Sequence, residues 1–168
     1  MALKRSSQRT LLPSLLDRLI DLEPNNRNEA SVVRAQSMKE LKDSVRRDLE
    51  WLLNSTRIPP AAEPPQAARA LWQSVYCYGL PDITGMAVRS QQERHRLARV
   101  VEIAISDFEP RLQNVVVTIP PNAPSARVMH FQIEAMLKME PAPERVFFDT
   151  TLELISGQYQ IEGESRAR

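Results

Sequence analysis

The chain has 168 residues, 42% of them apolar, which is enough for one domain with its own core, or for one domain with arms. Its 22 basic and 21 acidic residues nearly cancel, so no overall field marks it as a binder of nucleic acid or of an anionic membrane surface. Cys77 is the only cysteine, which excludes an internal disulfide framework and favours a reducing compartment, so we expect a cytoplasmic protein.

The N-terminal residues predict a short amphipathic arm. Five apolar residues recur there at helical spacing, and a polar loop follows them: Leu12, Leu15, Leu16, Leu19 and Ile20. A helix this short is marginal alone, so Leu15 and Leu19 are expected to contact a partner or the chain's own domain. Because Pro13, Asp17 and Arg18 interrupt the stretch, no signal-type core forms. No later stretch reaches a membrane-spanning length, so we expect no direct membrane insertion.

Two longer helices are indicated by capping boxes. Ser37 with Glu40 opens one apolar stripe, and Ser90 with Glu93 opens another. The first stripe comprises Leu41, Val45, Leu49, Leu52 and Leu53, and the second comprises Leu97, Val100, Val101, Ala104 and Phe108. Two double prolines at 56–66 predict an extended connector between the helices.

An aromatic cluster lies between the connector and the second long helix. Trp72, Val75, Tyr76 and Tyr78 precede a turn at Gly79 and are expected to pack together. Cys77 is expected to be a small buried apolar residue, because no local signature places a histidine to activate it.

The C-terminal half predicts strands. The period changes from helical to two at Asn114, and segments 126–139, 145–154 and 159–161 alternate between apolar and polar residues. Helices followed by adjacent strands predict an α+β fold, with N-terminal helices packed on a small antiparallel or mixed sheet. We therefore expect an arm over 1–30, a single domain over 31–162 that includes the connector, and a flexible tail over 163–168.

The chain carries little sequence signature of catalysis. Its four glycines form no phosphate-binding loop, and its two histidines have no metal-ligand spacing, so no cofactor, no metal and no enzymatic turnover are expected. One enzymatic alternative remains, glycoside hydrolysis by two of four acidic residues near the predicted sheet: Asp107, Glu109, Glu134 and Asp149. The basic stretch at 89–99 has no aromatic platform, so nucleic acid is not an expected partner.

Six motifs, in order along nearly the whole chain, carry a family resemblance. They are LLDRLID at 15–21, VRRDLEWLLNSTR at 45–57, SVYCYGLPDITGM at 74–86, FEPRLQNVVV at 108–117, HFQIEAML at 130–137 and VFFDTTLELISGQYQI at 146–161. With them the chain resembles the TssE family of type VI secretion baseplate subunits, which are related to the sheath-initiating wedge protein of contractile phage tails.

The resemblance implies a structural role. A member of that family sits in the cytoplasmic baseplate wedge with TssF, TssG and TssK, and its sheet is similar to the interlocking domain of the sheath subunits. It would offer the first rung for polymerisation of the TssB–TssC sheath. The family's long-used lysozyme-like label is carried along with the resemblance, so a peptidoglycan-cleaving hydrolase stays as the alternative.

The resemblance also implies site residues. The family's E-P-R motif contacts the baseplate core, and it falls here on Glu109, Pro110 and Arg111. Pro110 would fix a turn, Arg111 would offer a planar fork, and Glu109 would accept hydrogen bonds. The alternative is that Glu109 and Arg111 pair within the domain around a helix stop.

Strand addition to a sheet edge would explain sheath initiation. The strands that contain Thr151 and the pair Tyr159 and Ile161 are the candidate templates. The alternative is an ordinary hairpin that completes the sheet.

Overall fold

The structure is a computed structural model that describes Ser14, Asp17, Leu19 and the ranges 37–57, 69–82, 90–120, 128–139, 142–153 and 156–164. The chain divides into two compact units, Met1–Ser44 and Val45–Arg168, which are described separately. Most of the predicted arm, the connector beyond residue 57 and the tail beyond residue 164 lie outside the described residues.

The first unit contains the start of helix α2, Met38–Asn54. The predicted capping box is present: Ser37 N–H donates to Glu40 Oε2 at 2.7 Å, and Glu40 N–H donates to Ser37 Oγ at 3.2 Å. In the arm, the backbone is helical at Asp17 and Leu19. Ser14 Oγ accepts from Asp17 N–H at 3.1 Å, the pattern of an N-cap.

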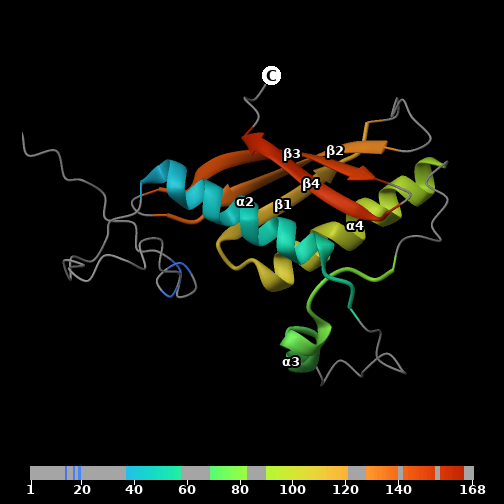
Figure 1. Cartoon of the computed structure of the whole chain (residues 1–168), viewed down its shortest axis with the longest axis horizontal. Coiled ribbons are helices and arrows are strands. Elements are labelled where there is room, and N and C mark those ends of the chain that lie inside the picture. The colour runs from blue at the N-terminus through green and yellow to red at the C-terminus, as the bar shows by residue number, and fades with distance from the viewer. Residues whose placement is uncertain are drawn as a thin grey trace, which may run out of the picture. The chain divides into compact units, whose positions relative to one another are not determined.

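The second unit holds a four-stranded antiparallel sheet in the order β1-β2-β3-β4, with helices α3, Arg69–Trp72, and α4, Gln91–Phe108 (Figure 1). The strands are β1, Leu112–Thr118; β2, Val128–Leu137; β3, Glu144–Glu153; and β4, Gln158–Glu164. Each strand pairs with the next along the chain. The predicted α+β fold is confirmed, and the sheet is wholly antiparallel in the described part of the chain.

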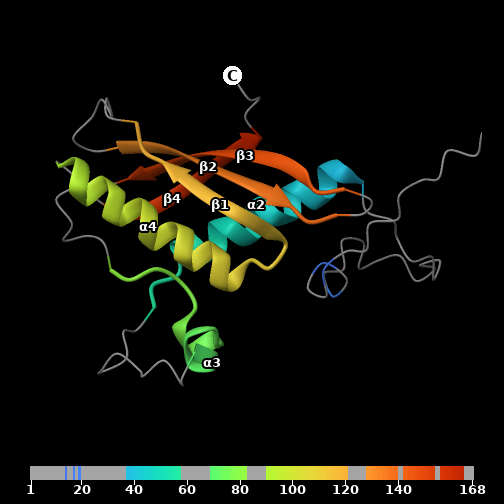
Figure 2. The same cartoon turned by 180° about the vertical axis from the view of Figure 1, so that it is seen from behind.

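One face of the sheet forms the core with α4 and with the part of α2 that belongs to this unit. The predicted alternation in β2 and β3 is confirmed by the buried residues Met129, Phe131, Ile133, Ala135, Leu137, Val146, Phe148, Thr150 and Leu152. The core is completed by buried residues of the two long helices: Val45, Leu49, Leu52 and Leu53 of α2, and Leu97, Ala98, Val101, Ala104 and Ile105 of α4. Helix α4 runs beside β1 (Figure 2). The opposite face carries polar pairs between β2 and β3, such as Gln132 Nε2 donating to Asp149 Oδ1 at 2.8 Å.

Strand β1 begins two residues before the predicted change of period and contains a bulge. Asn114 has a φ of 51°, and the pairing register with β2 shifts between Gln113 and Val116. Leu112 and Val117 are five residues apart, so regular alternation would put them on opposite faces. Because the bulge changes the phase of the strand, both side chains are buried.

The aromatic segment differs from its prediction. Val75, which is 89% exposed, and Tyr76 lie on a surface 3-10 turn, Val75–Cys77, so the expectation that both pack is wrong. The segment is anchored instead by the buried residues Cys77 and Leu80, because Leu80 N–H donates to the carbonyl of Ser55 at 2.8 Å. The predicted burial of Cys77 is confirmed.

Gly79 allows this anchoring. Its φ is 105°, and a Cβ added there would lie 2.2 Å from the carbonyl oxygen of Ser55. Only glycine fits both the backbone conformation and the close approach. Tyr78 packs edge-on against Phe108 at the end of α4, with ring centroids 5.3 Å apart.

Candidate functional site

The E-P-R turn joins α4 to β1. Glu109 is the C-cap of α4, and its N–H donates to the carbonyl of Ile105 at 2.8 Å. Pro110 follows on the surface and ends the helix, because it has no N–H to donate. The carbonyl of Glu109 accepts from Leu112 N–H at 3.1 Å, and the carbonyl of Arg111 accepts from Lys138 N–H at 2.7 Å. The turn is therefore held by main-chain hydrogen bonds on both sides of the proline.

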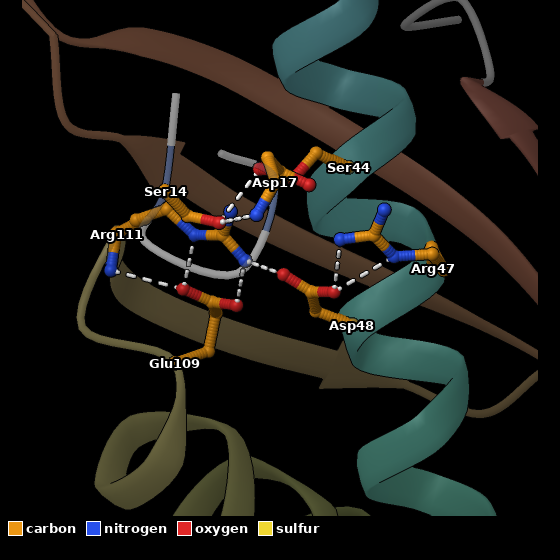
Figure 3. A network of polar contacts seen from close by, with 7 residues as sticks. All are labelled: Ser14, Asp17, Ser44, Arg47, Asp48, Glu109 and Arg111. Carbon is orange, nitrogen blue, oxygen red and sulfur yellow. Dashed lines mark hydrogen bonds and ion pairs between the residues drawn. The ribbon is translucent and has the colours of Figure 1, made fainter. Parts of the chain in front are cut away.

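An ion cluster of four side chains closes over this turn (Figure 3). Arg111 Nε donates to Glu109 Oε1 at 2.7 Å, and Arg111 Nη2 donates to Glu109 Oε2 at 2.5 Å. Arg111 Nη2 also donates to Asp48 Oδ2 at 2.5 Å. Asp48 Oδ1 accepts from Arg47 Nη2 at 2.8 Å. The cluster thus ties the end of α4 to the middle of α2, which is far away in the sequence.

The cluster is more buried than an ordinary surface ion pair, so removing one partner would leave a buried charge uncompensated. The side chain of Glu109 is only 6% exposed, that of Asp48 is 19% exposed and that of Arg111 is 22% exposed. Burial alone would lower the pKa of Arg111, but hydrogen bonds and charge from Glu109, and then from Asp48, outweigh it and raise the pKa. Arg111 therefore keeps its charge. The pKa of Tyr78 is raised by burial and then by the charges of Asp48 and Glu109.

The structure thus brings Glu109 and Arg111 together within the domain, which is the alternative that the sequence left open. Sequence reasoning missed Asp48. The sequence position of Asp48 could have indicated an ion-pair partner. Asp48 lies between the buried residues Val45 and Leu49 on α2, where a carboxylate needs a partner. Pro110 is exposed at the tip of the turn.

The strand candidates have different surroundings. Thr151, in β3, faces His130 of β2 on one side and Gln160 of β4 on the other, so its strand is internal and is not an open template. Tyr159 and Ile161 lie in β4, at the end of the strand order, with their side chains buried. Of the two candidate strands, only β4 is an edge.

The arm candidates are described only in part. Leu19 is 74% exposed. Leu15 lies outside the described residues.

The acidic residues considered for hydrolysis all have polar neighbours. The contacts of the four are Asp107 with Gln73, Glu109 with Arg111, Glu134 with Arg145 and Asp149 with Gln132. Within the described ranges, no group of three or more His, Cys, Asp or Glu side chains could hold a metal ion. No described helix combines the length and the apolar character that a membrane crossing requires.

Comparison with known proteins gives one family. The family model described as baseplate wedge protein gp25 matches residues 39–142, a range that contains α2 from its second residue onward, α4, the E-P-R turn, β1 and β2. Neither the search of curated proteins nor the search of solved structures gives a match.

Proposed function

This chain belongs to the family of the baseplate wedge protein gp25, and from that membership we propose that it is a structural wedge subunit in the baseplate of a type VI secretion system. Membership implies a structural role and assembly with other baseplate subunits. The further proposal is that it contacts TssF and TssG, in an assembly with TssK, and initiates the TssB–TssC sheath. The family match over α2, α4 and the first two strands carries this proposal.

We propose that the E-P-R turn is presented to TssF and TssG as a preformed surface. Pro110 stands exposed at its tip, while Glu109 and Arg111 are held beneath by each other and by Asp48. A surface whose side chains are already fixed loses little conformational entropy when a partner binds. In this proposal, the internal ion cluster supports the contact surface and does not compete with it.

Copurification with TssF and TssG tests the proposed turn contact. The test variant is Glu109→Ala plus Arg111→Ala, because removing both charges leaves no unpaired carboxylate in the turn. Asp48→Ala is the matched control, since it weakens the same cluster from α2 without changing the turn. Circular dichroism must show that both variants are folded.

The expected result is recovery of TssF and TssG by wild type and Asp48→Ala, and loss of recovery by the double variant. Equal recovery by all three would show that the turn is only an internal helix stop. No recovery by any of them, wild type included, would contradict the proposed partners.

We propose that sheath initiation uses β4 through strand addition. Its edge position supports this, because an edge strand presents main-chain donors and acceptors to an incoming strand. Replacing Thr151 by proline would not test strand addition at β4, because Thr151 lies in the internal strand β3 and the proline would break pairing with both β2 and β4. Instead, amide exchange at Ile161 should slow when TssB–TssC is added, and unchanged exchange would contradict a template at β4.

We also propose that the chain acts without enzymatic turnover, at the cytoplasmic face of the inner membrane. The structure offers no support for a general acid at Glu109, because both its carboxylate oxygens accept from Arg111. Release of reducing sugar from purified peptidoglycan by the wild-type chain, above the level given by an Asp107→Asn plus Asp149→Asn variant, would favour the hydrolase alternative.

A further inference from the structure

Strand β4 ends the sheet order, and its outer side has an unusual neighbour at Tyr159. The side chain of Asn54, the last residue of α2, contacts the main chain of Tyr159 twice. Tyr159 N–H donates to Asn54 Oδ1 at 2.8 Å, and Asn54 Nδ2 donates to the carbonyl of Tyr159 at 2.9 Å. A side-chain amide carries the same donor and acceptor as a peptide group, so Asn54 stands where a neighbouring strand would bind.

The two hydrogen bonds from Asn54 show which main-chain groups of β4 face away from β3. The N–H and the C=O of one strand residue point to the same side, and successive residues alternate. Because Asn54 takes both groups of Tyr159, these groups face away from Leu152, its register partner in β3. Gln160 then turns its groups toward β3, and Ile161 turns outward again.

Asn54 is fixed in this position by its own helix. Its Nδ2 also donates to the carbonyl of Glu50 at 2.8 Å, so three hydrogen bonds hold the amide. The opposite end of the sheet has a related contact, in which Val117 N–H in β1 donates to Glu102 Oε1 of α4 at 3.0 Å. Each outer strand therefore has main-chain hydrogen-bonding groups occupied by a side chain from a helix.

We propose that Asn54 is an edge guard. It occupies the donor and the acceptor that β4 would otherwise present at Tyr159, and so hinders a second copy of this chain from pairing with β4. Natural sheets avoid edge-to-edge association by covering or interrupting such edges. An incoming strand must displace Asn54 or begin its pairing at Ile161, so Asn54 also sets where a strand can join. The inference rests on the fold alone, so failure of the copurification above leaves it standing.

The test compares Asn54→Ala with Ser55→Ala. Ser55 is the matched control, because its Oγ donates to the carbonyl of Trp51 at 2.7 Å at the same helix end without reaching β4. Amide hydrogen exchange is followed by NMR at Tyr159 and Gln160, and self-association is followed by sedimentation velocity over a range of concentrations.

In Asn54→Ala, the Tyr159 amide should exchange at least about tenfold faster than in wild type, while Gln160 stays within about threefold. Two main-chain groups become available for pairing, so the dissociation constant for self-association should fall at least about tenfold. Ser55→Ala should match wild type in both measurements.

Unchanged exchange at Tyr159 would overturn the proposal. Equal acceleration at Tyr159 and Gln160 would also overturn it, because that result means general loosening of β4 and not the loss of a guard. An unchanged dissociation constant for self-association would show that Asn54 does not restrict pairing.

Discussion

Replacing Arg111 by alanine should show how much the ion cluster contributes to stability. Glu109 is 6% exposed and would lose both side-chain donors of Arg111. Leaving one partner of a fully buried pair uncompensated costs about 3–5 kcal/mol. Asp48 keeps Arg47, and both Asp48 and Arg111 are partly exposed, so the lower end applies. We expect the free energy of unfolding to fall by about 3 kcal/mol.

Urea unfolding followed by circular dichroism measures this cost, provided that the dependence of the free energy of unfolding on urea concentration has the same slope in both proteins. Arg111→Lys keeps the charge but loses the planar fork, so it should cost about half as much. Glu109→Ala plus Arg111→Ala should cost no more than Arg111→Ala alone, because the double variant has no orphaned buried carboxylate. A loss below about 1 kcal/mol for Arg111→Ala would refute the reasoning, since that value is typical of exposed pairs. A loss in the double variant equal to the sum of the losses in Glu109→Ala and Arg111→Ala would refute it as well.

Three further changes test other parts of the fold by the same unfolding assay. Thr150→Val should stabilise the chain by about 1 kcal/mol, since the buried Thr150 hydroxyl has no hydrogen-bond partner among the described residues; a loss of stability would reveal a partner. Gly79→Ala should cost about 3 kcal/mol, because the new Cβ meets the carbonyl of Ser55. Gly157→Ala, at a φ of 69°, is its control and should cost about 1 kcal/mol; equal costs would contradict the clash. Asn114→Gly should be neutral or stabilise by up to about 1 kcal/mol at its φ of 51°, and a clear loss would mean that the Asn114 side chain matters.

Where a local sequence pattern was strong, it predicted the helix or strand correctly. Ser37 and Ser90 locate the starts of α2 and α4, because capping boxes use side chains only three residues apart. The alternation around Ile133 gives the buried face of β2, because the period of a strand needs no knowledge of its neighbours.

What the sequence could not supply were contacts between distant residues. Asp48 and Arg111 are 63 positions apart, and Asn54 and Tyr159 are 105 positions apart. Only the packing of α2 brings these pairs together. The exposure of Val75 was missed for a related reason, since an apolar residue on a short surface turn has the same composition as one in a core.

The bulge at Asn114 has a consequence for how this chain can vary in length. It supplies the one extra residue that keeps Val117 buried while Leu112 is also buried and Arg111 can reach Asp48. Deleting that residue would restore regular alternation, so that either Leu112 at the start of β1 or Val117 near its end would face solvent. Substitutions at Asn114 are therefore tolerable in a way that a single-residue deletion is not, and homologous chains should change length in the loops that flank β1 rather than within it.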